Sequence, residues 1–267
     1  MGAQTDIILL QNVCKAYSQG KKHIPALVDL TLSISQGEFI SLMGSSGCGK
    51  STVTKIIAGI ENIDNGKLFI KGTDCSLGVP KSIQADIGYI FQWHNLAEWR
   101  TVEKNLYLPL EMHGIKKDKS WVEKSAKYLQ LMGLENYSKV YPHELSGGMR
   151  QRVGIARALM TEPVMLIFDQ PFGALDAITR GILANEISDL ARSEKKTILM
   201  VTSNIDEAVR YSDKICVLSD RPGTVKRIIN TGITQEQRKR SDFWLDPVHL
   251  ELKKEVIHTI YSEDEAM

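Results

Sequence analysis

The sequence predicts an α/β protein built on a mostly parallel β-sheet. Strand-length apolar runs recur along the chain, and segments with helical periodicity separate them. Some runs are apolar throughout, as at 164–168 and 198–201, which is typical of strands that are covered on both faces. Because strands and helices alternate, we expect the α/β class. The helical segments with the clearest periodicity are 51–60, 148–160 and 177–191.

Three further regions depart from this alternation. Residues 7–34 combine strand-like alternation with a Ser-Gln-Gly turn, so we expect an antiparallel β subdomain beside the core. Residues 93–158 are mostly helical in pattern and predict an inserted α-helical subdomain. After a main domain at 5–232, a short C-terminal tail at 233–267 contains apolar residues four apart, from Val248 to Ile260. This spacing predicts an amphipathic helix that packs one face on the domain.

Composition excludes several classes of protein. The 267 residues carry 33 Lys and Arg against 32 Asp and Glu, which gives a net charge of +1 and no basic excess for binding nucleic acid. The apolar runs are too short to span a membrane, and the N-terminus has no secretory pattern. The cysteines are scattered, as in proteins with reduced thiols. We therefore expect a cytoplasmic protein that obtains any membrane part from a partner.

A phosphate-binding loop is the first motif with chemical content. The pattern Gly, four residues, Gly-Lys-Ser follows an apolar run at 39–43 and opens a helical segment. Glycines allow successive backbone N–H groups to face a phosphate at a helix N-terminus. In such a loop Lys50 reaches the β- and γ-phosphates and the Ser51 hydroxyl ligates Mg²⁺. The loop consists of Gly44, Ser45, Ser46, Gly47, Cys48, Gly49, Lys50 and Ser51, and Thr52 follows it.

Asp169 is the acidic residue expected to complete this site. It ends the apolar run 164–168, and an aspartate at the end of a buried strand holds the metal of a phosphate-loop protein. By itself an aspartate at a strand end is more often a turn residue, and only its pairing with the phosphate loop favours a metal role. The sequence thus predicts a P-loop NTPase core that binds ATP and Mg²⁺.

A second glycine motif identifies a family. The run Leu145, Ser146, Gly147, Gly148, Met149, Arg150, Gln151 and Arg152 precedes the strand that ends in Asp169. It resembles the signature of ATP-binding-cassette (ABC) ATPases, and the resemblance extends over about residues 5–230. It implies that Tyr17 stacks on adenine and that Gln92 contacts Mg²⁺ beside Ser51 and Asp169. It also implies that the loop Ala174, Leu175 and Asp176 crosses a dimer interface.

The resemblance further implies partners. In this family two ATPase domains face each other head to tail, and the signature of each caps the nucleotide of the other. In transporters, closure of the pair moves helices of transmembrane permease subunits. The runs 149–152, 171–176 and 206–208 are similar to importers of the nitrate, sulfonate, taurine and bicarbonate class, which also use a substrate-capture protein. We therefore expect a peripheral subunit at the cytoplasmic face of the membrane.

Two positions depart from the family pattern. Gln170 stands where the family has a glutamate that acts as general base, and an amide cannot accept the proton. General-base catalysis typically contributes about 10²- to 10⁴-fold in rate. Ser203 stands where the family has a histidine that contacts the γ-phosphate, and Asn204 replaces the following aspartate. ATP binding should persist while hydrolysis at this site is weak or absent.

Several interpretations of these departures stay open. The chain can be a naturally degenerate subunit whose intact signature completes the active site of a different, catalytically competent ATPase subunit. It can be a silent regulatory module that holds ATP without turnover. Gln170 alone would also suit an engineered trap of an active ATPase, although Ser203 has no such rationale. An ABC ATPase of DNA repair is disfavoured, because the segment between Gly49 and Ser146 is too short for the coiled-coil insertion of that class.

Overall fold

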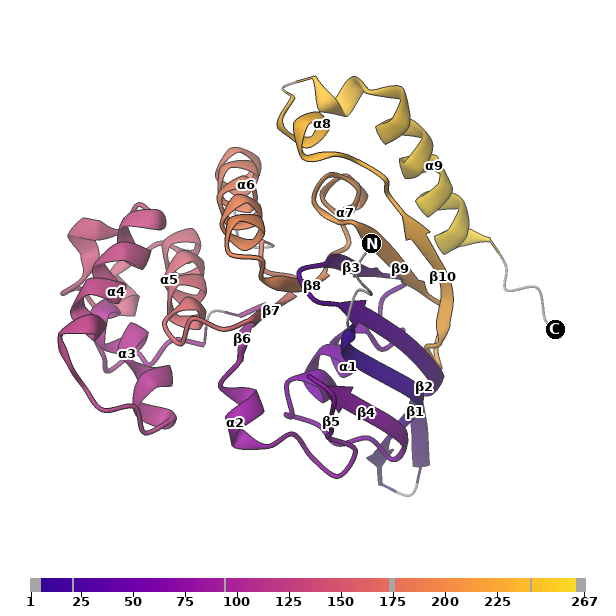
Figure 1. The fold of residues 1–267 in the computed structure, drawn as a ribbon, viewed down its shortest axis with the longest axis horizontal. Helices are drawn as coiled ribbons and strands as arrows, with labels where there is room; N and C mark the ends of the chain where they lie inside the picture. Colours follow the sequence, from indigo (N-terminus) through magenta and orange to yellow (C-terminus); the bar gives the residue numbers. More distant parts are fainter. Residues whose placement is uncertain (1–5, 21, 94, 173–175, 241, 263–267) are drawn as a thin grey trace. The chain divides into compact units, whose positions relative to one another are not determined.

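The computed structural model describes residues 6–20, 22–93, 95–172, 176–240 and 242–262. The chain forms two compact units, and each is described by itself. The first unit is made of Met1–Pro80 and Thr197–Met267, and the second of Lys81–Lys196. Figure 1 shows the elements with their labels. Within the described residues, no helix combines the length and the apolar character that crossing a membrane requires.

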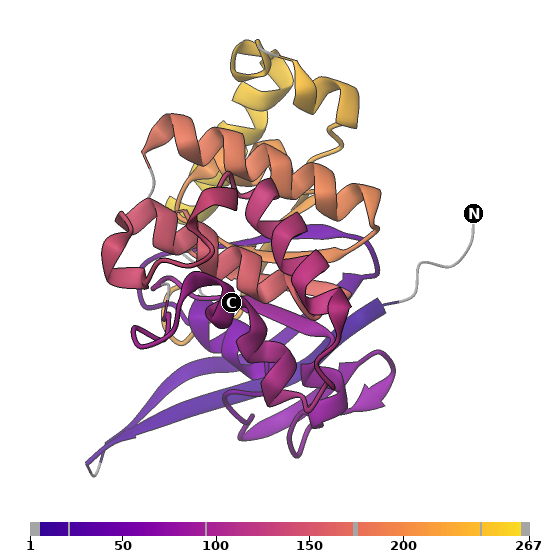
Figure 2. The same cartoon turned by 90° about the vertical axis from the view of Figure 1, so that its left-hand side faces the viewer.

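An antiparallel sheet forms one part of the first unit. Its strand order is β2-β1-β4-β5, and the pairing of β1 with β2 runs from Asp6 opposite Ser35 to Gln19 opposite Lys22. Figure 2 shows these two strands lying side by side along their length. The antiparallel subdomain expected from residues 7–34 is therefore confirmed. The strands are β1 (Asp6–Gln19), β2 (Lys22–Ser35), β4 (Asn65–Ile70) and β5 (Thr73–Asp74).

The core strands of the first unit carry its functional loops. Strand β3 (Phe39–Met43) pairs in parallel with β8 (Thr197–Val201) on one side and β9 (Lys214–Leu218) on the other. Every residue of β3 and β8 is buried, as the continuous apolar runs predict. Because the strands are parallel, the loops that follow β3, β8 and β9 leave the same edge of the sheet.

Sequence patterns did not identify β10 (Val225–Asn230). It pairs antiparallel with β9 and buries only one side chain fully, that of Ile229, so it has no continuous apolar run. The remaining elements of this unit are α1 (Lys50–Ile57), α7 (Ile205–Tyr211), α8 (Gln235–Lys239), η3 (Phe243–Leu245) and α9 (Pro247–Tyr261).

The C-terminal helix α9 packs on the first unit through part of the predicted face. Val256 is fully buried, and Leu252 and Ile260 pack against the same cluster, whereas Val248 is 43% exposed. Figure 1 shows α9 running alongside α7 and β10. The described part of the tail therefore adds a layer to this unit.

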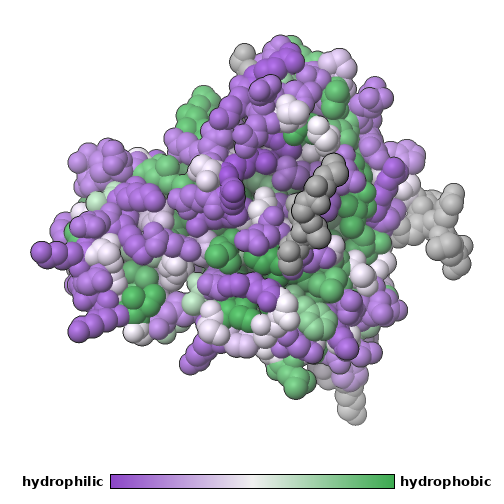
Figure 3. Space-filling model, in the orientation of Figure 1, coloured by the Kyte–Doolittle hydropathy of each residue, from purple (hydrophilic) through white to green (hydrophobic). Residues whose placement is uncertain are grey.

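Among its described residues, the second unit contains strands β6 and β7 and the larger share of the helices. Strand β6 (Ile87–Ile90) pairs in parallel with β7 (Met165–Asp169), all of whose residues are buried. Figure 3 shows a mostly hydrophilic surface over α3–α5, with separate hydrophobic patches. The α/β class, with mostly parallel core strands and a helical part, is thus confirmed. The helices are α2 (Lys81–Gln84), α3 (Val102–Met112), α4 (Lys119–Leu131), η1 (Glu135–Tyr137), η2 (Pro142–Glu144), α5 (Gly147–Leu159) and α6 (Ala177–Ser193).

Candidate nucleotide-binding site

The phosphate loop, residues 44–51, has a backbone conformation that requires glycine at three positions. Gly44, Gly47 and Gly49 have φ angles of 143°, 81° and 106°, which side-chain-bearing residues rarely adopt. At Gly49 a Cβ atom would also lie 2.5 Å from Cδ2 of Leu27 and 3.0 Å from the carbonyl oxygen of Ala26. At Gly47 a Cβ would meet nothing within 4 Å, so its glycine is required by φ alone.

Lys50 lies at the centre of the loop. Its Nζ atom donates to the carbonyl oxygens of Gly44 (2.8 Å) and Ser45 (2.6 Å) and to Sγ of Cys48 (3.6 Å). The side chain is buried, with 8% of its surface exposed. The ammonium group is therefore held inside the loop by loop atoms.

The N-terminus of α1 adds positive potential to the loop. Its N-cap residue, Gly49, has no side chain to cap the helix, and the first turn contains no acidic residue. The first backbone N–H groups of a helix have no partners within the helix, and together with the helix dipole they favour an anion. Residues 44–51 at the end of β3 therefore have a conformation and a charge that suit an anion.

Two side chains from elsewhere in the first unit touch the loop and its helix. Tyr17 Oη donates to Oγ1 of Thr52 (3.4 Å), which places the half-buried Tyr17 ring next to α1. Ser45 Oγ donates to Asp220 Oδ1 (2.5 Å). Asp220 was not predicted, because its contact joins positions far apart in the chain; its place after β9, at the same sheet edge as the loop, was the available signal.

The second unit contains Asp169 and Gln170 at the end of β7. Asp169 is 7% exposed, and its Oδ2 accepts a hydrogen bond from Tyr89 Oη (3.2 Å) on the neighbouring strand β6. Tyr89 is a second residue that the sequence analysis missed. Gln170 is half-buried and has a φ of 52°, so the strand turns sharply where the expected general base would stand.

The signature residues open helix α5 in the same unit. Ser146 is the exposed N-cap, and its Oγ accepts from the N–H of Met149 (3.3 Å). Leu145 is buried below it, and Gln151 Nε2 donates to the carbonyl of Phe91 (3.3 Å). This bond ties α5 to the segment directly before Gln92, whose side chain is exposed. Gly147, Gly148, Met149 and Arg150 are half-buried.

Asp176, expected at a dimer interface, is the exposed N-cap of α6. Its carboxylate accepts from the N–H groups of Ile178 (3.1 Å) and Thr179 (2.9 Å), and hydrogen bonds from Thr179 lower its pKa. Ala174 and Leu175 of the same expected loop lie outside the described residues.

Ser203, at the predicted histidine position, lies in a loop fixed by its neighbours. Glu207 accepts from Thr202 Oγ1 (2.8 Å) through one carboxylate oxygen and from Asn204 Nδ2 (3.2 Å) through the other. The N–H of Asn204 donates to Thr202 Oγ1 (3.0 Å). Ser203 itself is exposed between these anchored residues. We call residues 202–204 the Ser203 loop; its anchor, Glu207, was not predicted.

The residues expected to hold a metal fit Mg²⁺ by their donor chemistry. Ser51, Gln92 and Asp169 offer a hydroxyl, an amide and a carboxylate oxygen, the hard ligands that Mg²⁺ prefers. In the part of the chain that the structure describes, no group of three or more His, Cys, Asp and Glu side chains could hold a metal ion by itself.

Comparisons with known proteins agree with this geometry. Residues 27–173 match the family model described as ABC transporter. The chain is 42% identical over 215 residues to the aliphatic sulfonates import ATP-binding protein SsuB of Bacillus subtilis, covering 80% of this chain and 81% of that protein. It is 38% identical over 257 residues to the bicarbonate transport ATP-binding protein CmpC of Synechococcus elongatus, covering 94% of this chain but 37% of that longer protein.

A solved structure extends the likeness to three dimensions. A dimeric ATP-binding cassette in a post-hydrolysis state, bound to ADP and Pi, superimposes with a TM-score of 0.77. It is 34% identical to this chain and covers 84% of it and 98% of its own length. The phosphate loop, the signature at the start of α5 and these likenesses together lead to one assignment: this chain belongs to the ABC transporter family as an ATPase domain.

Proposed function

We propose that this chain is the ATP-binding subunit of an ABC importer for a small anion, such as nitrate, bicarbonate or a sulfonate. It works at the cytoplasmic face of the membrane, bound to transmembrane permease subunits that a substrate-capture protein serves. The names of the sulfonate and bicarbonate import relatives support the substrate class. A second, non-identical ATPase subunit completes the pair.

ATP binds with its phosphates in the phosphate loop. Lys50 contacts the β- and γ-phosphates, and the N–H groups at the start of α1 contact the β-phosphate. The position of the Lys50 ammonium within the loop, bonded to the carbonyls of Gly44 and Ser45, supports this role. Tyr17 stacks on the adenine, and its hydrogen bond to Thr52 keeps the ring beside α1.

Ser51, Gln92 and Asp169 hold Mg²⁺ when the nucleotide is bound. The metal would neutralise negative charge on the β- and γ-phosphates. Tyr89 orients the Asp169 carboxylate by occupying Oδ2. These metal contacts help to hold the nucleotide and do not require that it is hydrolysed.

Hydrolysis at this chain's own site is weak or absent, and the substitutions Gln170 and Ser203 carry this proposal. An amide has no basic oxygen to take a proton from water, and the serine hydroxyl is shorter than an imidazole and cannot reach as far. Losing the general base alone would slow hydrolysis by about 10²- to 10⁴-fold.

The signature of this chain serves the partner's nucleotide. Ser146, Gly147 and Gly148 present a helix N-terminus to the partner's γ-phosphate, and Asp176 lies at the interface between the two domains. The exposed position of Ser146 at the start of α5 supports this role. The complex therefore has one productive site, built on the partner's glutamate and histidine.

A silent regulatory module is the alternative. In that interpretation the chain holds ATP persistently and closes with its partner but never turns ATP over. The geometry of bound ATP is the same in the two interpretations, so they differ only in whether this chain hydrolyses ATP. An engineered Glu-to-Gln trap is a third possibility, and it predicts that Gln170→Glu alone restores hydrolysis.

Single-turnover hydrolysis by the purified complex tests the proposal, with the partner's catalytic glutamate replaced so that only this chain can react. We expect weak turnover at most, little recovery with Gln170→Glu, and clear recovery with Gln170→Glu plus Ser203→His. Residual turnover by this chain would exclude the silent module, and full recovery with Gln170→Glu alone would favour the trap. Rapid turnover by the unmodified chain would overturn the proposal.

A second measurement tests whether the signature of this chain completes the partner's nucleotide site. In the complex with an intact partner, Ser146→Arg should abolish steady-state hydrolysis, because it blocks the N-terminus of α5 that faces the partner's nucleotide. Ser193→Arg, at the exposed end of α6, is the matched control and should leave the rate unchanged. Hydrolysis that survives Ser146→Arg would contradict this assignment.

A further inference from the structure

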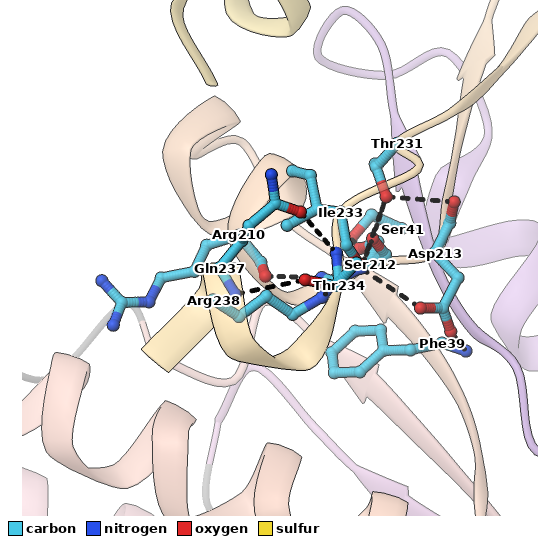
Figure 4. Close-up of polar contacts among 10 residues, drawn as sticks. All are labelled: Phe39, Ser41, Arg210, Ser212, Asp213, Thr231, Ile233, Thr234, Gln237 and Arg238. Atoms are coloured by element: carbon cyan, nitrogen blue, oxygen red, sulfur yellow. Dashed lines mark hydrogen bonds and ion pairs between the residues drawn. The ribbon is translucent and has the colours of Figure 1, made fainter. Parts of the chain in front are cut away.

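The described part of the tail is anchored to the first unit by a buried arginine (Figure 4). Arg238 is 7% exposed, and its Nε donates to the carbonyl of Ile233 (3.2 Å). Its Nη1 donates to the carbonyl of Arg210 (2.5 Å), and its Nη2 to the carbonyl of Ser212 (2.8 Å) and to Asp213 Oδ1 (3.2 Å). One guanidinium group thus joins α8 to the C-terminal end of α7 and to the turn before β9.

The tail also holds the N-terminal end of α7. Asp206, in the first turn of α7, accepts from Lys253 Nζ at 2.8 and 2.9 Å and is hydrogen-bonded to His249 Nε2 at 3.0 Å. Both partners lie on α9. His249 is 1% exposed and packs edge-on against Phe243, with ring centroids 4.9 Å apart. The contact with Asp206 is therefore made by a buried imidazole that is packed against an aromatic ring.

Apolar packing fills the space between these two polar anchors. Ala208 and Val209 of α7 belong to one buried cluster with Phe243 and Val256 of the tail, and this cluster includes Met43, the last residue before the phosphate loop. Helix α7 has only 7 residues, and a helix of that length is not stable without tertiary packing. The tail therefore supports α7 at both ends and along its buried side.

Helix α7 in turn fixes the Ser203 loop. Its residue Glu207 holds Thr202 with one carboxylate oxygen and Asn204 with the other, and the Asn204 side chain caps the helix. The contacts run without a gap from the tail to Asp206, through the first turn of α7 to Glu207, and on to both neighbours of Ser203.

We propose that the tail is a positioning element for the Ser203 loop, acting through Asp206 and α7. This inference rests on the proposed function in one respect, that position 203 faces the γ-phosphate of bound ATP. The tail then keeps the loop in place even though serine has replaced the histidine. Asp206, Lys253 and Arg238 are positioning residues, because they act on the site through α7 and touch no nucleotide.

A gain-of-contact experiment on the full chain tests the inference. Ser203→His should raise the preference for ATP over ADP by about tenfold, the effect of one hydrogen bond to a charged group. Adding Asp206→Asn should reduce that gain to about twofold, because α7 then no longer holds the Ser203 loop in a fixed position. The measured quantity is the ratio of the ATP and ADP dissociation constants. It is measured well below the melting temperature, so that a loss of stability alone does not change the ratio.

Glu255→Gln provides the matched control. Glu255 pairs with Arg227 at 2.7 Å, and its side chain is 36% exposed against 38% for Asp206, but the pair joins α9 to β10 and does not touch α7. The gain should survive Glu255→Gln. Where Asp206→Asn folds poorly, Lys253→Gln removes two of the three contacts to Asp206 and should give the same loss.

The outcomes separate the two proposals. A gain that persists undiminished in Asp206→Asn and Lys253→Gln overturns the role of the tail and leaves the proposed function standing. No gain from Ser203→His means that position 203 does not face the γ-phosphate, which overturns the inference together with that part of the proposed function. A loss that Glu255→Gln produces equally would assign the effect to general loosening of the tail and also overturn the inference.

Discussion

The phosphate loop and the Ser203 loop follow neighbouring parallel strands, β3 and β8, yet they are fixed in different ways. The first is held mainly from within, by positive φ angles at glycines and by the Lys50 side chain bonded to loop carbonyls within six residues, with the bond from Ser45 to Asp220 as a contact from outside. The second is held by side chains, with Glu207 as the anchor and the tail behind it. A loop fixed by its backbone tolerates few substitutions, whereas the exposed position 203 can change its chemistry without losing its geometry.

Replacing Lys50 in the phosphate loop should have the largest effect on ATP binding. Lys50→Ala removes a buried ammonium that would bond two phosphates, each bond to a charged group being worth about 1.5–3 kcal/mol. We expect the ATP dissociation constant to rise by about 10²-fold or more, measured by isothermal titration calorimetry. Lys55→Ala, one turn further along α1, is the control; a similar loss there would contradict the assignment.

Replacing Gly47 tests whether backbone conformation alone holds the phosphate loop, because a Cβ there would meet nothing within 4 Å. Gly47→Ala places a side chain at a φ of 81°, a strain of about 1–3 kcal/mol, so ATP affinity should fall by roughly 10- to 100-fold. Gly181→Ala in α6, where a Cβ meets nothing within 4 Å, should instead raise stability by up to about 1 kcal/mol. Calorimetric binding and thermal unfolding check both, and unchanged ATP affinity in Gly47→Ala would refute the backbone argument.

Tyr89→Phe should have a moderate effect on the metal. It removes the hydrogen bond to Asp169 and keeps the ring, so the Mg²⁺ concentration for half-maximal ATP binding should rise about fivefold, equivalent to about 1 kcal/mol. Tyr107→Phe also removes a tyrosine–carboxylate hydrogen bond, to Glu103 at 2.9 Å, but away from Asp169. Equal Mg²⁺ requirements in the two variants would show that Tyr89 does not orient Asp169.

The smallest effect is expected from acid at the contact between α7 and the tail. Burial by itself raises the pKa of Asp206, but hydrogen bonds from Lys253 and His249, with their charges, lower it below the usual 3.8. A carboxyl group with a lower pKa in the folded state contributes stability above its unfolded-state pKa and loses that contribution as pH falls through the folded-state pKa.

Asp206→Asn should therefore cost about 0.5–1 kcal/mol of unfolding free energy at neutral pH, the range for partly exposed ion pairs. The difference from the unmodified chain should shrink as the pH falls below 3.8. Urea unfolding across this pH range measures it. A difference that stays constant down to pH 2 would mean that the Asp206 charge does not contribute.

Much of the fold followed from patterns that are local in the chain. The buried strands β3, β7 and β8 were predicted from continuous apolar runs, and α5 from its cap Ser146 and its periodicity. Strand β10 was not predicted because only one of its side chains is buried and the others are half-buried or exposed. It therefore lacks the apolar run or alternation that indicates a strand. Helix ends were less well predicted: α1 stops at Ile57, and Gly59 with a φ of 69° follows it.

In the candidate site, the residues with a fixed spacing were found and the residues that support them were not. Asp220, Tyr89 and Lys253 contact Ser45, Asp169 and Asp206 across sequence separations of 175, 80 and 47 residues. No local pattern marks such contacts, since they depend on which strand ends and helix faces the packing brings together.

The sequence by itself determined the phosphate loop, the signature and the two substitutions at positions 170 and 203, because glycine conformations and helix caps are set within a few residues. Only the tertiary structure decided that the tail supports α7 through Asp206 and Arg238, whereas the bonds from Glu207 to Thr202 and Asn204 span only five and three residues. The physical reason is that a seven-residue helix takes its position from what packs on it, and its contacts with the tail come from residues more than 25 positions further along the chain.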